Sequence, residues 1–580
     1  MQKYYIYTIR NIAGALSQKT LLLFFLLPTI LFAQLPQERV YIDTDKAFYL
    51  TGETAWFSLY CLEKESHKLS QVSKVAYLEL IDKEAKPVMQ EKIRIEGGKG
   101  KGQLFIKPEL PSGVYYLRAY TSWMKNFDHR HFFESSIHIV NPFSPVEISD
   151  NKSDEPDNIP EFEIKPEGNI LSLDLSKTSF GNREKVDLTL DLKKETLAHL
   201  SVSVYKHEPG FPLKTNMDHY WAGEYQGEEK EIKIVNYPPE IRTQVLTGRV
   251  NRPGIEQVDV FVPGATPQYY SIPVKPNQTF ITEVSPEQSG TEILVWTENI
   301  KIASSDIDVF SPFVNQHTIK NPVGLGFDED DIPVLETLSM NAQIANAYLP
   351  FSQTRGYDYQ TEYVKVPFYG EADNTYRLDD YTRFPTLEEV FIEYVQYVKT
   401  RKTGSREHFY AWDLYTNTTT ISNSTYFQEP ALVIIDGVPV SDLSYVWNLD
   451  ARLVEKIDIV NRKYLSGNKA ISGILSFSTF KNDFGGRDYP SDILTKNFQG
   501  LMAPKAFYSP QYETEETNKS KIPDYRTLLH WEPDLTISDS RVVTFYTGDN
   551  FGYYRIEVNG ITSDGEKIHQ THLFQVTNYR

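Results

Sequence analysis

The sequence predicts a mainly β protein, built of tandem immunoglobulin-like β-sandwiches with an inserted mixed α/β domain. Short alternating apolar segments separated by turn residues recur over most of the 580 residues, which is typical of sandwich strands. Residues 431–480 alone combine a continuous apolar strand, a short helix and further strands. The length predicts about four to six domains. Hydrophobic residues make up 40% of the chain, which excludes wholesale disorder.

Residues 1–33 have the composition of a secretory signal peptide. Three basic residues and no acidic one accompany an apolar run from Leu21 to Phe32. The run of roughly twelve residues is shorter than the about twenty that a membrane helix needs. We expect the mature chain to begin at Gln34 without a lipid anchor, because no cysteine follows the run. These features predict an exported protein of the periplasm, the outer membrane or the cell surface, with no membrane-spanning segment of its own.

The first predicted sandwich spans residues 38–141. Its short apolar strands are separated by turn signals, including Gly52, a glycine cluster at 97–102 and Pro-Ser-Gly at 111–113. The cluster does not continue into Lys-Ser or Lys-Thr, so it predicts a hairpin turn and not a phosphate-binding loop. A polar segment at 149–158 without apolar side chains marks the end of this domain.

Two further sandwiches and a connector are predicted next. The second sandwich covers 160–236 and contains alternating leucines at 188–192, and the third covers 240–310. Residues 311–383 are predicted to be an extended connector with a short helix that begins behind Pro333.

The mixed α/β domain is predicted at 384–482. Thr386 and Glu389 have the spacing of a capping box, and the apolar period behind them predicts a helix that ends near Gly404. The apolar strand at 431–435 is predicted to be central in this domain.

The last region combines a tight turn with a return to strands. Asp436 and Gly437 directly follow the apolar strand and are the residue pair typical of a hairpin turn, so we expect no catalytic role for Asp436. Residues 483–580 are predicted to form a separate C-terminal β-sandwich.

Two segments of the first sandwich resemble the macroglobulin-type domains of bacterial alpha-2-macroglobulins. Residues 44–53 follow the order Thr-Asp-Lys-x-x-Tyr-x-x-Gly-Glu, and residues 112–120 read Ser-Gly-Val-Tyr-Tyr-Leu-Arg-Ala-Tyr. The block 240–310 is similar to a carboxypeptidase-regulatory-like sandwich. Macroglobulin protease traps commonly use a Cys-Gly-Glu-Gln thioester. The single cysteine, Cys61, lies outside such a sequence, so we expect it to be a buried apolar residue.

The block 384–482 resembles the plug domain of TonB-dependent outer-membrane transporters. Residues 430–440 read Pro-Ala-Leu-Val-Ile-Ile-Asp-Gly-Val-Pro-Val, and segments 454–460 and 472–477 follow in the order found in plugs. A transporter barrel of about twenty-two strands would need several hundred further residues. The resemblance therefore implies an envelope location and a plug-like domain without a barrel of its own.

The densest group of candidate metal ligands is Asp128, His129, His131 and Glu134. On a strand the two histidines would share a face, but zinc needs three or four converging ligands, so a polar loop is the favoured interpretation. The acidic run at 328–331 lacks the spacing of an EF-hand and predicts a solvated loop. We therefore assign no catalytic, cofactor-binding or metal-binding residue and expect no cofactor.

The net charge of -19 disfavours nucleic acid as a partner, because phosphate binding needs a basic face. The sequence predicts a non-enzymatic cell-envelope protein that acts through protein–protein contacts, as an accessory subunit of an outer-membrane barrel, transport or assembly complex. The expected partner is an outer-membrane barrel protein or its assembly or export machinery. The alternatives are a macroglobulin-like protease inhibitor without the thioester and a ligand-binding accessory protein for nutrient uptake.

Overall fold

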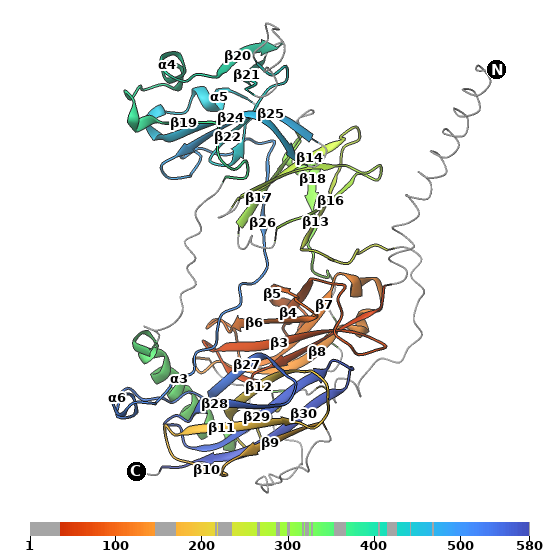
Figure 1. The fold of residues 1–580 in the computed structure, drawn as a ribbon, viewed down its shortest axis with the longest axis vertical. Coiled ribbons are helices and arrows are strands. Elements are labelled where there is room, and N and C mark those ends of the chain that lie inside the picture. Colours follow the sequence, from red (N-terminus) through yellow and green to blue (C-terminus); the bar gives the residue numbers. More distant parts are fainter. Residues whose placement is uncertain are drawn as a thin grey trace, which may run out of the picture. The chain divides into compact units, whose positions relative to one another are not determined.

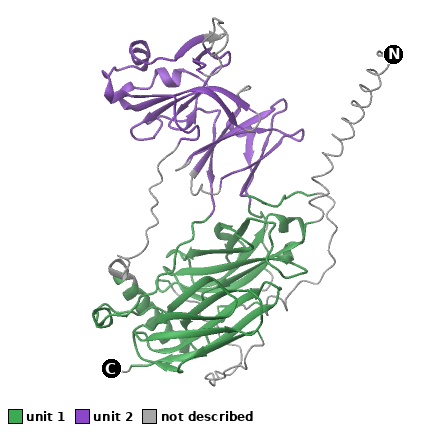
Figure 2. Cartoon of the chain, in the orientation of Figure 1, with its two compact units in different colours: residues 1–242, 313–358, 502–580 green, residues 243–312, 359–501 purple. Residues whose placement is uncertain are grey.

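The computed structural model describes residues 35–144, 170–214, 217, 235–263, 267–285, 291–297, 302–315, 318–319, 324–325, 327, 329–352, 367–403, 406–414, 426–440, 442–466 and 469–578. The predicted signal peptide and the polar segment at 149–158 lie outside these ranges. The chain divides into two compact units (Figure 2). Unit 1 comprises Met1–Arg242, Phe313–Asp358 and Met502–Arg580, and unit 2 comprises Thr243–Pro312 and Tyr359–Leu501. Both units are mainly β, as the sequence predicts.

The N-terminal sandwich of unit 1 has a three-stranded and a five-stranded sheet (Figure 1). The first has the order β1 (Glu38–Thr44), β3 (Thr54–Glu63) and β6 (Lys99–Phe105), and the second has the order β2 (Phe48–Leu50), β8 (Phe133–Val140), β7 (Gly113–Thr121), β4 (Val75–Ile81) and β5 (Pro87–Arg94). All seven residues of β1 are buried. The strand is buried on both faces partly because it also packs against the next sandwich, where the Ser201 hydroxyl donates to Asp43.

The second sandwich of unit 1 is assembled from two distant parts of the chain. One sheet has the order β10 (Ser179–Phe180), β30 (Lys567–Val576), β29 (Gly552–Thr562), β12 (Ala198–Lys206) and β27 (Leu528–Ile537), and the other has the order β28 (Ser540–Tyr546), β11 (Lys185–Leu192) and β9 (Leu171–Leu175). Separate sandwiches at 160–236 and 483–580 were therefore a wrong prediction. Four short strands cannot enclose a core alone, so the two segments complete one another and share one apolar cluster.

The helix predicted behind Pro333 is present as α3 (Ile332–Ser352) and belongs to unit 1. It follows the one-turn helix η4 (Glu329–Asp331). Leu338 of α3 packs in a small apolar cluster with Phe48, Leu50 and Phe327. The helix therefore rests against β2 of the N-terminal sandwich.

Residues 502–527, which include the short helix α6 (Glu515–Asn518), connect both sandwiches of unit 1. The Met502 amide donates to the Lys92 carbonyl of the first sandwich. Arg183 of the second sandwich is buried and donates to the Ser520 carbonyl at 2.7 Å and to the Asp549 carboxylate at 2.6 Å. The segment is thus held by hydrogen bonds at both ends.

Unit 2 begins with a third sandwich. One sheet has the order β16 (Thr279–Glu283), β13 (Val245–Val250) and β18 (Ile307–Val309), and the other has the order β15 (Gln268–Pro273), β14 (Gln257–Val262), β17 (Thr291–Trp296) and β26 (Leu494–Phe498). The sequence placed β26 in the C-terminal sandwich. Its residues instead pair antiparallel with β17, because Phe498 completes the apolar cluster of the third sandwich.

The remainder of unit 2 is mixed α/β. Its five-stranded sheet has the order β19 (Asn374–Arg377), β24 (Val454–Ser466), β25 (Lys469–Thr479), β22 (Leu432–Ile435) and β23 (Val438–Pro439), accompanied by α4 (Leu387–Glu393), α5 (Ser444–Trp447) and the hairpin β20 (Val398–Thr403) and β21 (Arg406–Ala411). The long strand β25 is central, and the predicted central strand lies beside it. β22 has four residues and pairs parallel with only four of the eleven residues of β25.

The capping box at Thr386 and Glu389 is present, but the helix behind it is shorter than predicted. It ends at Glu393, and residues 398–403 form a strand in place of the predicted last helical turns. Tyr397 adopts a φ of 66°, which a helix cannot accommodate. The residues that follow pair with β21, and Val398 packs against the core of unit 2.

The predicted Asp-Gly hairpin turn is confirmed. Asp436 and Gly437 have φ values of 50° and 84° between the paired strands β22 and β23. The Asp436 carboxylate accepts hydrogen bonds from the Thr479 amide at 2.7 Å and from the Phe484 amide at 3.1 Å. A Cβ atom at Gly437 would lie 2.6 Å from the Phe261 ring. Asp436 is therefore a structural residue of unit 2.

Among the helices of the described ranges, none is both long and apolar enough to cross a membrane.

Candidate binding site

The Thr-Asp-Lys-x-x-Tyr-x-x-Gly-Glu segment forms a hydrogen-bonded turn between β1 and β3. The buried Asp45 carboxylate accepts from the Tyr49 hydroxyl at 2.7 Å and from the Trp56 amide at 2.8 Å. Lys46 Nζ donates to both carboxylate oxygens of Glu53, at 2.9 and 2.8 Å. Each charged residue of the motif thus stabilises the turn, and this explains why these residue types occur together.

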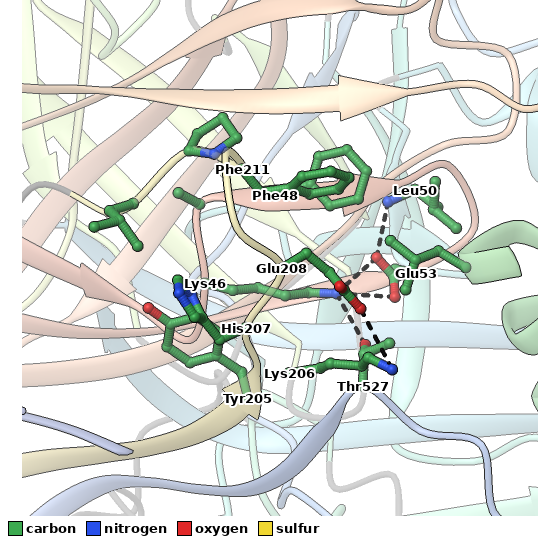
Figure 3. A pocket seen from close by; sticks show the side chains of 14 residues that line it. Lys46, Phe48, Leu50, Glu53, Tyr205, Lys206, His207, Glu208, Phe211 and Thr527 are labelled. Carbon is green, nitrogen blue, oxygen red and sulfur yellow. Dashed lines mark hydrogen bonds and ion pairs between the residues drawn. The ribbon is translucent and has the colours of Figure 1, made fainter. Parts of the chain in front are cut away.

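A pocket opens beside this turn, within unit 1 (Figure 3). Four parts of the chain contribute to it: the β1–β3 turn, the end of β12 with the loop behind it, helix α3 and the residue before β27. The lining residues are Lys46, Ala47, Phe48, Leu50, Glu53, Tyr205, Lys206, His207, Glu208, Phe211, Pro212, Leu213, Leu338 and Thr527. The cavity volume is about 40 Å³. A buried water needs roughly 10–15 Å³, so the pocket has room for a few waters or one side chain.

The floor of the pocket is apolar and aromatic. Phe48 and Phe211 meet edge to face with ring centroids 5.0 Å apart, and Phe48 is 5.6 Å from Phe327. Leu50 and Leu338 are buried beside them. Aromatic and branched side chains in this arrangement offer an apolar surface of fixed shape.

The charged groups of the lining neutralise one another. Besides the Lys46–Glu53 pair, Lys206 Nζ lies 3.3 Å from Glu208 and donates to Asn550 at 2.6 Å and to the Phe551 carbonyl at 2.7 Å. Burial, followed by the charge of Arg555, lowers the pKa of His207, so this ring is neutral at neutral pH. The pocket therefore presents neutralised charges around an apolar floor.

The loop that carries the pocket residues is anchored by a buried lysine. Lys214 Nζ lies 2.9 Å from Asp43, donates to the Thr44 carbonyl at 2.8 Å and reaches Ser203 at 3.1 Å. Asp43 also accepts from Asn559 at 2.9 Å. Burial raises the pKa of Asp43, and the ammonium of Lys214 opposes this shift. Lys214 and Ser203 are both buried.

Glu557 lies in the same buried network. Burial alone would raise its pKa, but Lys214, Arg555 and His569 together lower the pKa below its ordinary value. Its carboxylate also accepts from the Tyr205 hydroxyl at 3.0 Å. The network joins β1 of the first sandwich to β12 and β29 of the second and sets their packing.

The four candidate metal ligands do not converge. Asp128 binds Arg130 and caps the short helix η2 (His129–His131), and Glu134 pairs with the buried Arg118. Within the described ranges, no three His, Cys, Asp or Glu side chains are grouped as metal ligands. Of the acidic run at 328–331, the described residues form the helical turn η4 in place of the predicted loop; Glu329 and Asp330 are exposed to solvent, as predicted, and Asp331 is buried.

Cys61 is buried in β3, and burial raises the pKa of its thiol well above the ordinary value. The sequence did not indicate the pocket. Its residues come from positions 46–53, 205–213, 338 and 527, and the packing of both sandwiches and α3 against one another brings them together. The one local signal is Pro-Gly at 209–210, within the loop that lines the pocket, where Gly210 has a φ of 79°.

No family model matches the chain, and no curated protein matches it. Solved structures of bacterial alpha-2-macroglobulins align with it at 9% identity and a TM-score of 0.24: the Salmonella protein reacted with methylamine, covering 94% of this chain, and the native Escherichia coli protein, covering 93%. The chain spans 40% of the length of each. A TM-score this low supports no argument about function.

Asp45 makes the stability of the turn dependent on pH. Burial raises its pKa to about 7, although Lys46 and the Tyr49 hydroxyl act in the opposite direction. The folded protein therefore binds a proton here that the unfolded chain releases above about pH 4. Ionisation of Asp45 therefore lowers the free energy of unfolding as the pH rises from about 4 to about 7.

We predict that Asp45→Asn removes this loss, because the amide oxygen still accepts from Tyr49 and Trp56. Thermal unfolding of both proteins across pH 4 to 8 measures it. The melting temperature of the variant should rise relative to that of the unmodified protein with increasing pH and level off above about pH 7. A difference that is constant with pH would show that Asp45 is ionised throughout.

Proposed function

We propose that this chain is a non-enzymatic cell-envelope protein that acts through protein–protein contacts, as an accessory subunit of an outer-membrane barrel, transport or assembly complex. The observation that carries the proposal is the pocket of unit 1, in which an apolar floor is surrounded by charges that already neutralise one another. Protein interfaces have this pattern at their centres, where an apolar anchor enters a pocket with a satisfied polar rim.

The size of the pocket favours a side chain of a partner over a small polar substrate. Sites for whole cofactors or metabolites commonly measure about 300–1,000 Å³. Lys46 and Lys206 are engaged in ion pairs, and a ligand would have to break these pairs in order to use either ammonium group. A leucine or phenylalanine from a partner would instead complete the packing around Phe48 and Leu338. The aliphatic Leu213, which is 53% exposed at the rim, would be covered in the complex.

The mixed α/β block of unit 2 supports the envelope assignment. Its sequence order resembles a TonB plug, and we propose that it docks on an outer-membrane barrel or on the assembly or export machinery for such barrels. In this role the chain would be exported to the periplasm, the outer membrane or the cell surface. The competing function for this block is that of a spacer between sandwiches.

The test compares Leu213→Asp with Leu197→Asp. Both residues are exposed leucines of unit 1, but Leu197 lies outside the pocket, so both variants should fold. Each mature protein is immobilised and incubated with native envelope extract, and bound proteins are identified by mass spectrometry. We expect an outer-membrane protein to bind the unmodified chain and Leu197→Asp and to be lost from Leu213→Asp. Equal recovery by all three would show that the pocket does not bind the partner.

A further inference from the structure

The hairpin of β20 and β21 in unit 2 has two chemically different faces. The register pairs Lys399 with Tyr410 and Arg401 with His408, and cross-strand partners share a face. These four side chains therefore lie on one side of the hairpin. The opposite side packs into the core of unit 2 through Val398, Phe409 and Ala411.

The two cations on the first face rest on aromatic rings. Lys399 Nζ lies 3.7 Å from the centroid of the Tyr426 ring, and the Arg401 guanidinium lies 4.8 Å from that of Tyr410. Neither cation forms an ion pair with a described carboxylate. Cation–π contacts hold such side chains in place without neutralising their charge. The face is therefore an ordered cationic surface on a chain with a net charge of -19.

This concentration of charge lowers the stability of the hairpin. Lys399 and Arg401 lie two residues apart on one face of β20, and like charges so placed repel one another. Burial, followed by the charge of Arg401, lowers the pKa of Lys399. No described carboxylate of unit 2 pairs with these charges, so a ligand of opposite charge would relieve the repulsion.

The same strand offers an open edge. β20 pairs with β21 and with no other described strand. The far side of β21 is occupied, because the amides of Phe427 and Ala431 donate to the Ala411 and Phe409 carbonyls. An extended peptide that added to β20 would find, along one strand, two fixed cations and backbone groups that have no partner among the described strands.

We propose that β20 binds an extended acidic segment of a partner polypeptide by strand addition. Successive side chains on one face of a strand are about 6.6–6.8 Å apart. A segment with a carboxylate at every second residue therefore places its charges beside Lys399 and Arg401. This surface is separate from the pocket of unit 1, and either site can be tested without the other.

A rival explanation is that these basic residues keep the edge from pairing with another copy. Charged side chains, and lysine above all, commonly protect edge strands from aggregation. Under this explanation, the edge does not bind acidic peptides, and removal of the charges causes self-association.

The test uses the mature chain, a fluorescein-labelled Thr-Glu-Thr-Glu-Thr-Glu-Thr peptide and its lysine counterpart. We expect the glutamate peptide alone to bind, with an affinity that falls as salt is added. Lys399→Glu with Arg401→Glu should weaken binding at least about tenfold. Lys496→Glu makes one such charge reversal on an exposed residue of β26 and should leave binding unchanged.

Hydrogen exchange distinguishes strand addition from simple charge attraction. The bound glutamate peptide should slow amide exchange across residues 398–403. Three results would overturn the proposal. The peptide could bind without slowing this exchange, or it could bind the double variant as well as the unmodified chain. Phosphatidylglycerol vesicles could slow the exchange when the peptide does not. A double variant that self-associates in sedimentation, when the unmodified chain does not bind the peptide, would also overturn it.

Discussion

Lys214→Met should destabilise unit 1 by about 3–5 kcal/mol, which is typical when one partner of a buried ion pair is removed. The side chains of Lys214 and Asp43 are 3% and 0% exposed, and their charged atoms are 2.9 Å apart. Methionine fills a similar volume but leaves the carboxylate of Asp43 with its hydroxyl and amide partners only, those of Ser201 and Asn559. The free energy of unfolding, measured by denaturant titration, checks the prediction.

The pH dependence of this loss separates charge from packing. Without Lys214 the pKa of Asp43 should rise further, because burial is then less opposed. Protonation of Asp43 would relieve the cost, so the loss should be larger at pH 8 than at pH 5.

Two variants serve as controls. Asp43→Asn with Lys214→Met removes both charges and should recover part of the stability. Lys194→Met deletes a surface cation that pairs with Glu566 and should leave the stability nearly unchanged. A loss for Lys214→Met no larger than for Lys194→Met would show that the ion pair contributes nothing to the packing of the sandwiches.

Features that depend on residues close together in the sequence could be predicted from the sequence. The mainly β class, the capping box at Thr386 and the turn at Asp436 each follow from a local pattern, because strand alternation, side-chain capping and left-handed backbone involve residues close in sequence. The pairing of β12 with β27 and β29 joins residues more than 300 positions apart. No local pattern encodes which of several similar apolar strands will meet, so the composite sandwich could not be predicted.

The pocket was missed for the same reason. Phe48, Phe211 and Leu338 are ordinary apolar residues in their own segments, and they become a floor only when α3 and the loop after β12 pack against β2. The Thr-Asp-Lys-x-x-Tyr-x-x-Gly-Glu motif was visible because its charges interact within ten residues. Its role as one wall of a pocket depends on Thr527, which approaches Lys46 to 3.4 Å from the far end of the chain.

Ile434→Asp should unfold unit 2 as a whole. Ile434 lies in β22, is 2% exposed and faces a cluster that joins the α/β sheet to Phe261 and Trp296 of the third sandwich. A buried, unpaired carboxylate costs several kcal/mol, and the lost apolar packing adds about 2–5 kcal/mol. Together these losses are comparable to the about 5–15 kcal/mol that stabilises a typical domain.

The unfolding of unit 2 alone can be resolved by limited proteolysis of the full chain. Because the third sandwich and the α/β block share one cluster, sites in both segments, 243–312 and 367–501, should become cleavable together, while unit 1 stays resistant. Ile392→Asp makes the same substitution at a residue of α4 that is 73% exposed, and it should leave the cleavage pattern unchanged. Cleavage confined to the α/β block would mean that the third sandwich is stable without it. An unchanged pattern for Ile434→Asp would contradict the burial of β22, because an exposed aspartate at this position would carry no desolvation cost.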